Sequence, residues 1–114
     1  MSCELEATDR FGRTLRLHHP NWQAHIRKQP AIEPYHDELA TLLADPDVVM
    51  EDTRDGHYHF YREGLTSGRF SDAYLRAVVE YFGDGSSGVI KTVWLSFRID
   101  PRGVPRWIRP TRTS

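Results

Sequence analysis

The chain has 114 residues, of which 39% are hydrophobic and 27% charged, and its formal net charge is −1. This size and composition are typical of one globular domain, so we expect residues 1–114 to form a single domain with a core near residues 13–108 and flexible ends at 1–10 and 109–114. The single cysteine excludes a disulfide framework and a multi-cysteine zinc site, and no apolar run approaches the about 20 residues that span a bilayer. We therefore expect a cytoplasmic protein with no membrane contact and no cofactor.

Acidic and basic residues are separated along the chain. Residues 33–55 contain eight acids and one base, whereas six bases and one acid occur from Lys91 onwards. Separated fields of this kind can steer a polyanion to one side of a molecule. The alternative is a solvated acidic helix face followed by a basic tail.

Helical patterns follow one short strand in the first half of the chain. Alternation predicts a strand at residues 13–17, and Asn21 can cap a short helix that Pro30 ends. A second helix is predicted from Pro34 to the Asp45-Pro46 pair, because apolar side chains recur there at helical spacing. These side chains are Tyr35, Leu39, Leu42 and Leu43.

The hydrophobic period changes to two after residue 46, which predicts strands. They are expected near residues 48–52, 57–62, 74–82 and 89–98, with a polar loop at 63–72. Helices followed by an antiparallel meander describe an α+β fold, in which N-terminal helices pack on one face of a curved antiparallel sheet of about four strands. Such a sheet can leave its other face open.

One strand of this meander carries chemical groups on one face only. His57, His59 and Tyr61 alternate with the bulky Tyr58 and Phe60, and strand side chains alternate between the two faces. The same alternation in the next two strands predicts an open face with polar groups from all three, and Trp94 as a stacking platform. These groups are His57, His59, Tyr61, Arg76, Glu80, Thr92 and Ser96.

Residues 89–98 contain one exception to this scheme. Alternation places Val89 in the core and Ile90 on the open face. It places Lys91 on the core face, away from the polar groups with which it would act. A bulge could rotate Lys91, or its long stem could reach round the sheet edge.

The residues of the open face suit metal-independent RNA cleavage. The RNA supplies the 2′-hydroxyl as nucleophile, and the protein must supply a base, an acid for the 5′-oxygen and cations for the phosphorane. Histidine suits both proton-transfer roles, and arginine forks onto phosphate oxygens. Two alternatives remain: an outer face that is merely polar, and a metal site on His57 and His59. Nothing in the sequence requires a third ligand, so we predict no metal.

Five short motifs occur in a fixed order along the chain. Together they resemble the phage-type branch of the barnase–EndoU–colicin–RelE-like nucleases, a superfamily of RNases and toxins, over residues 13–108. The fold of that family, helices before a curved four-stranded antiparallel sheet, is similar to the one expected above. The motifs are Asn21-Trp22-Gln23-Ala24-His25-Ile26, Leu42-Leu43-Ala44-Asp45-Pro46-Asp47-Val48-Val49, Phe60-Tyr61, Leu75-Arg76-Ala77-Val78-Val79 and Val89-Ile90-Lys91-Thr92-Val93.

The resemblance implies a set of catalytic residues. His25 would be the general base or acid, and Tyr61 and Thr92 would orient the scissile phosphate. Arg76 and Lys91 would stabilise the pentacovalent intermediate, with Arg62 as an alternative phosphate-binding base. For substrate binding, we expect His57, His59, Arg62, Trp94 and Arg98.

The predicted function is a small metal-independent endoribonuclease, a phage- or prophage-type toxin that cleaves tRNA or mRNA. Toxins of this type usually have a neutralising antitoxin or immunity protein, which would be a partner. The near-neutral net charge favours an alternative, a non-catalytic RNA- or protein-binding module of the same fold. A metal-dependent hydrolase that uses His57 and His59 is a third possibility.

Overall fold

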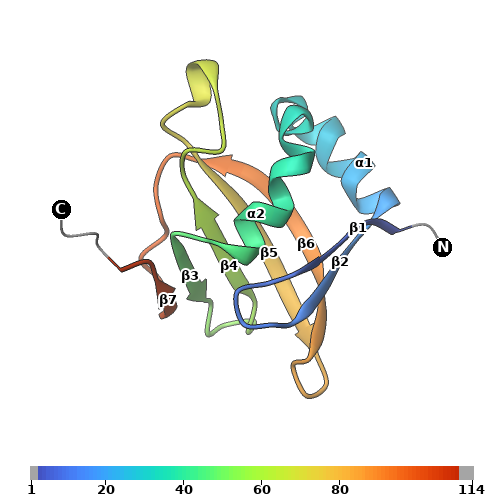
Figure 1. Ribbon diagram of the computed structural model, residues 1–114, viewed down its shortest axis with the longest axis vertical. Coiled ribbons are helices and arrows are strands. Elements are labelled where there is room, and N and C mark those ends of the chain that lie inside the picture. The colour runs from blue at the N-terminus through green and yellow to red at the C-terminus, as the bar shows by residue number, and fades with distance from the viewer. Residues whose placement is uncertain (1–2, 111–114) are drawn as a thin grey trace.

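The computed structural model describes residues 3–110, which form a seven-stranded sheet with a helical segment in front of strands β4, β5 and β6 (Figure 1). Strands flank the helical segment on both sides in the sequence. In chain order the elements are β1 (Cys3–Thr8), β2 (Thr14–His18), α1 (His19–Lys28), the 3-10 helix η1 (Pro30–Glu38), α2 (Leu39–Ala44), β3 (Val48–Glu51), β4 (Tyr58–Arg62), the 3-10 helix η2 (Gly68–Phe70), β5 (Tyr74–Phe82), β6 (Ser87–Ser96) and β7 (Val104–Ile108).

The strands lie in the order β1-β2-β6-β5-β4-β3-β7. All neighbours are antiparallel except β2 and β6, which pair in parallel through residues 14–16 and 87–89. The sheet is therefore mixed, and β1 and β7 form its two edges.

The predicted fold class is wrong. We expected N-terminal helices on an antiparallel sheet of about four strands, whereas the sheet has seven strands, contains a parallel pair and begins before the first helix. Cys3–Thr8, within the segment expected to be a flexible end, form β1. Residues 1–2 and 111–114, also expected to be flexible, lie outside the described residues. The last strand contains Pro105, which weakens a strand pattern and is tolerated at a sheet edge.

The helical segment differs from the expected helices in its boundaries. The first helix begins at His19 and carries Pro20 in its first turn, where a missing N–H costs nothing. The expected second helix is divided into η1 and α2, and only the part from Leu39 onwards is α-helical. Among the described residues, no helix is both long and apolar enough to cross a membrane.

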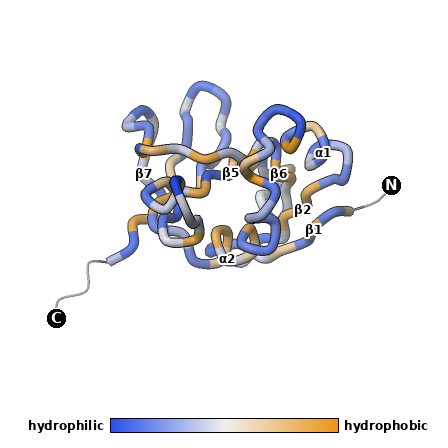
Figure 2. Tube along the Cα trace, turned by 90° about the horizontal axis from the view of Figure 1, so that it is seen from above, coloured by the Kyte–Doolittle hydropathy of each residue, from blue (hydrophilic) through white to orange (hydrophobic). Residues whose placement is uncertain are grey.

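The core lies between this helical segment and one face of the sheet. Phe60, Ala77 and Val93 from the strands meet Trp22 and residues of η1 and α2 in one cluster of buried side chains. Seen from above, α2 lies on one side of β5 and β6, and both α2 and these strands contain hydrophobic segments (Figure 2). We call the opposite face, which carries His59, Tyr61 and Arg76, the open face.

A β-bulge in β6 sets which of its residues reach the open face. Val78 pairs with Thr92, but the next residue, Val79, pairs with Ile90, so Lys91 is the extra residue. An extra residue reverses the alternation on one side of the bulge. Ile90 is therefore fully buried in the core, and its expected place on the open face is wrong.

The connection from β6 to β7 runs across the open face. β6 ends where Ser96 pairs with Tyr74, whereas β7 begins at the other end of the sheet, where Val104 pairs with Glu51. Residues 97–103, here called the crossing segment, join these two points. The backbone N–H of Asp100 donates to the Tyr61 hydroxyl at 3.3 Å, which ties the crossing segment to β4.

Replacing Asp9 with alanine should lower the free energy of unfolding by about 3 kcal/mol, because it leaves three partly buried donors without an acceptor. The Asp9 side chain is 4% exposed, and its carboxylate accepts the backbone N–H groups of Phe11 and Arg13 at 2.9 and 3.0 Å. It also accepts a short hydrogen bond from the Tyr81 hydroxyl. Urea unfolding of the two proteins measures the difference.

Tyr81→Phe is the matched control for Asp9→Ala. It removes one donor and leaves both backbone donors in place, so we expect a smaller loss of about 1 kcal/mol. Burial, and then the hydrogen bond to Asp9, raise the pKa of Tyr81 far above its usual value. The folded state therefore favours the protonated phenol, and wild type loses this stabilisation as the pH rises above about 10. Tyr81→Phe has no phenol at this position and should not show this loss. Equal stability of Asp9→Ala and wild type would contradict the account of this cluster.

Candidate functional site

Arg76 lies at the centre of the open face, between two aromatic side chains. The strand register pairs it with Tyr61 on β4 and with Trp94 on β6. Its guanidinium carbon is 4.8 Å from the Tyr61 ring centroid and 4.3 Å from the Trp94 ring centroid. Cation–π contacts at such distances hold an arginine in one place without a carboxylate partner.

His59 is the hydrogen-bonding partner of this arginine. Nη2 of Arg76 lies 2.8 Å from Nδ1 of His59, and because a guanidinium can only donate, Nδ1 accepts and the imidazole proton is on Nε2. Burial, and then the positive charge of Arg76, lower the pKa of His59 below its ordinary value. Burial also lowers the pKa of Arg76, whose buried Nε has no hydrogen-bond partner in the described part of the chain. The site thus holds a neutral histidine beside an incompletely paired cation.

The lowered pKa of His59 should make part of the protein's stability depend on pH. In the unfolded chain His59 takes up a proton near pH 6.5, whereas in the folded protein it stays neutral to a lower pH. Its contribution is therefore present in full above pH 6.5 and is lost as the pH falls through the folded pKa. In urea unfolding from pH 8 to 5, the free energy of unfolding of wild type should fall more steeply toward acidic pH than that of His59→Gln. A difference that is the same at every pH would contradict this account of His59.

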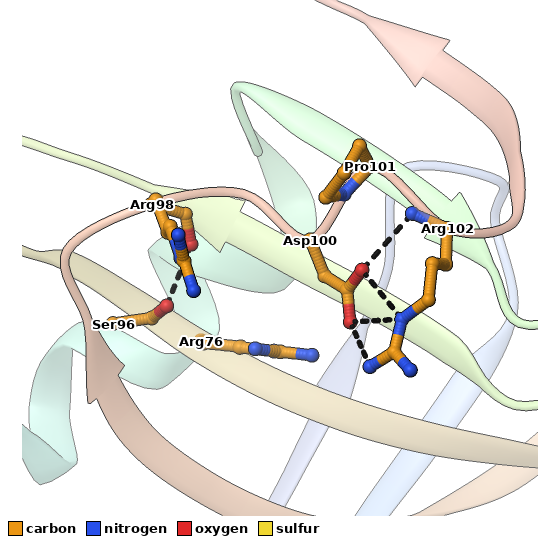
Figure 3. A pocket seen from close by; sticks show the side chains of 6 residues that line it. All are labelled: Arg76, Ser96, Arg98, Asp100, Pro101 and Arg102. Atoms are coloured by element: carbon orange, nitrogen blue, oxygen red, sulfur yellow. Dashed lines mark hydrogen bonds and ion pairs between the residues drawn. The ribbon is translucent and has the colours of Figure 1, made fainter.

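A pocket of about 420 Å³ opens between Arg76 and the crossing segment. Figure 3 shows the Asp100 carboxylate pointing toward the side where the guanidinium groups of Arg76 and Arg102 lie. Nη2 of Arg102 is 2.8 Å from Asp100, and hydrogen bonds from Arg102, together with the charge of Arg76, hold the pKa of Asp100 well below its usual range. The lining residues are Arg76, Ser96, Arg98, Asp100, Pro101 and Arg102.

The charges around this pocket favour an anionic ligand. Three arginines line it against one carboxylate, and Arg98 has no side-chain hydrogen bond among the described contacts. The Ser96 hydroxyl donates to the Arg98 carbonyl at 2.6 Å, which fixes the start of the crossing segment. Phosphate oxygens match both the charge and the forked donors of such a cluster.

His25 lies at the edge of β6, where β2 no longer pairs with it. The pairing of β2 and β6 ends at Val89, and α1 lies beside the remaining edge. Nε2 of His25 is 2.9 Å from the Lys91 carbonyl oxygen, and the Gln29 side chain accepts the Leu95 N–H at 3.3 Å. Since a carbonyl only accepts, Nε2 of His25 is the donor, and in a neutral imidazole Nδ1 is then the ring nitrogen that can accept a proton. His25 therefore caps an unpaired strand edge.

Most residues predicted for the site share one region of the molecule. The open face carries five of them, namely His59, Tyr61, Arg76, Thr92 and Trp94. Arg98 lines the pocket between Arg76 and the crossing segment. His25 and Lys91 lie at the adjoining β6 edge, with the Lys91 ammonium 3.5 Å from Glu80.

Three of the residues predicted for the site, Tyr61, Arg62 and His57, have contacts that the sequence did not indicate. Tyr61 is fully buried, so it supports Arg76 and the crossing segment rather than facing solvent. Nη1 of Arg62 donates to the backbone and carboxylate oxygens of Asp45, both at 2.7 Å, and thereby joins β4 to the turn before β3. Nδ1 of His57 lies 3.2 Å from the Asp55 carboxylate at the start of β4.

Asp100 and Arg102 were not among the predicted site residues. They lie in the turn Asp100-Pro101-Arg102-Gly103, and the turn pattern gave no sign that it crosses the sheet. The run of bases after Lys91 was the only available signal for Arg102.

The described part of the chain offers no obvious metal centre. Within residues 3–110, no three or more histidine, cysteine, aspartate or glutamate side chains are grouped so that they could hold a metal ion. His57 and His59 thus have no third ligand of these types in that range. No family model, curated protein or solved structure matches the chain.

Proposed function

We propose that the protein is a small metal-independent endoribonuclease that binds single-stranded RNA across its open face. The observation that carries the proposal is the placement of Arg76, between two aromatic rings and beside a neutral histidine, at a pocket lined by two further arginines. This combination offers a phosphate site and a stacking surface at one point of the sheet.

Binding would use two kinds of contact. Arg76, Arg98 and Arg102 supply forked donors for phosphate oxygens. The partly exposed Trp94 lies directly beside Arg76 and offers a ring for a base to stack on. Stacking of bases with backbone charge contacts is the usual way in which sheet surfaces bind single strands.

Cleavage would follow from 2′-hydroxyl attack. Nδ1 of His25 removes the 2′-hydroxyl proton, the 2′-oxygen bonds to phosphorus, and the bond from phosphorus to the 5′-oxygen breaks. The proton then passes from His25 to the leaving 5′-oxygen, which gives a 2′,3′-cyclic phosphate and a 5′-hydroxyl. The cations of Arg76 and Lys91 stabilise the phosphorane.

The proposal extends to the setting of the reaction. The target would be tRNA or mRNA in the cytoplasm, as for a phage- or prophage-type toxin. A cognate antitoxin or immunity protein would then restrain the activity.

The experiment is incubation of end-labelled single-stranded RNA with the purified protein in EDTA. The proposal predicts fragments that end in a 2′,3′-cyclic phosphate, at the same rate with and without added Mg²⁺. Cleavage that EDTA abolishes would contradict the proposed metal-independent chemistry.

A non-catalytic RNA-binding module is the second candidate. It is favoured by the hydrogen bonds that the titratable and charged groups already make within the protein. His59 is hydrogen-bonded to Arg76, and Arg102 is hydrogen-bonded to Asp100. His25 is hydrogen-bonded to the Lys91 carbonyl. RNA that is bound but stays intact, in EDTA and in Mg²⁺ alike, would support this second function.

A further inference from the structure

A second pocket lies on the open face, at the end of β5 opposite to the pocket under the crossing segment. Its volume is about 450 Å³, and its lining includes Glu6, Thr14, Arg16, Phe82 and Ser87. Phe82 is 50% exposed and is one of the large apolar residues that the core leaves uncovered.

Strand register shows that both pockets belong to one surface. Phe82 pairs with Ser87, and Glu80 pairs with Val89, which in turn pairs with Arg16 on β2. Phe82 follows Arg76 by six positions on β5, an even number, so their side chains lie on the same face. At about 3.3 Å per residue they are about 20 Å apart along the strand.

The groups in the second pocket resemble those around Arg76. The Trp94 ring lies beside Arg76, and the Ser96 hydroxyl lines the first pocket. The second pocket is lined by the Phe82 ring, by Arg16 and by hydroxyl-bearing side chains. Arg16 is paired with Glu6 at 3.0 Å, and both side chains are more than half exposed. Exposed ion pairs of this kind contribute little stability, so Arg16 can exchange Glu6 for a phosphate at small cost.

We propose that this second pocket is a nucleotide subsite, in which a base stacks on Phe82 and Arg16 contacts the adjoining phosphate. The inference rests on the proposed RNA binding and deepens it. The RNA strand runs along β5 from Trp94 and Arg76 to Phe82, past the Glu80–Lys91 ion pair. A ligand long enough to reach both pockets therefore binds more tightly than a short one.

The test measures the Kd of fluorescent 2′-O-methyl oligouridines, which cannot be cleaved by 2′-hydroxyl attack, at fixed salt. One probe has two nucleotides and the other six. Wild type is expected to bind the longer probe at least about tenfold more tightly, as one added stacking contact predicts. Phe82→Leu keeps an apolar side chain but removes the ring, so it should bring the two affinities together and leave that of the short probe unchanged. Phe82→Tyr keeps the ring and should behave as wild type.

Two results would overturn the subsite. One is a Phe82→Leu protein that binds the long probe as wild type does, and the other is an equal loss for both probes. Failure of wild type to bind either probe would instead overturn the proposed function, and the subsite with it. The outcomes thus distinguish the two.

Discussion

His25→Gln should lower the rate of RNA cleavage by at least about 100-fold, which is the smaller end of the usual effect of losing a proton-transferring side chain. Glutamine can still donate its amide hydrogen to the Lys91 carbonyl, which His25 contacts at 2.9 Å in wild type. The edge of β6 therefore stays capped, but the side chain can no longer take up a proton. Single-turnover cleavage of labelled RNA measures the effect, and the thermal midpoint confirms that the fold is retained.

His19→Gln is the matched control for this change. His19 lies at the start of the same helix, is exposed, and contacts Glu4 rather than β6. We expect its cleavage rate to equal that of wild type. If His25→Gln cleaved RNA as fast as this control does, His25 would not be the proton-transferring group.

Replacing Arg76 with methionine should weaken RNA binding by about 100-fold and leave the protein folded. The guanidinium supplies the charged donors at the centre of the open face, and a hydrogen bond to a charged group contributes about 1.5–3 kcal/mol. Methionine replaces the unbranched aliphatic stem of the arginine and can pack between Tyr61 and Trp94. Because it also removes a half-buried cation whose Nε has no hydrogen-bond partner within residues 3–110, the thermal midpoint should change little.

Arg10→Met provides a control with the same change in charge and side chain. The Arg10 guanidinium also lies over an indole, 3.9 Å from the Trp107 ring centroid, and its backbone N–H donates to Leu43 of α2 on the helical side of the sheet. RNA affinity should be nearly unchanged in this variant. Equal losses for Arg10→Met and Arg76→Met in fluorescence anisotropy would show that net charge, and not the open face, governs binding.

The sequence predicted which side chains share the open face better than it predicted the architecture of the sheet. The period of two is imposed by strand sterics, so it placed His59, Tyr61, Arg76 and Trp94 on one face without knowledge of the sheet. Neighbouring strands of a meander pair in sequence order, which is why these residues also lie close together.

What the sequence could not predict depends on contacts between distant segments. A bulge at Lys91 was one of two possibilities that the sequence left open, and only the register of β5 and β6 decides between them; the bulge moved Ile90 into the core. The parallel pairing of β2 with β6 joins segments about 70 residues apart, and no local pattern encodes it. The path of residues 97–103 over the open face likewise depends on where β7 pairs, so Asp100 and Arg102 were missed.

The three tryptophans allow a direct test of the claim that RNA binds the open face. Trp94 lies on that face, Trp22 is buried in the core, and the Trp107 indole donates to the Pro46 carbonyl at 3.4 Å. In an NMR titration with the unreactive six-nucleotide probe, the indole N–H signal of Trp94 should shift most, and those of Trp22 and Trp107 should stay nearly in place. A titration that shifts the Trp107 signal most, or none of the three at saturating RNA, would contradict the account.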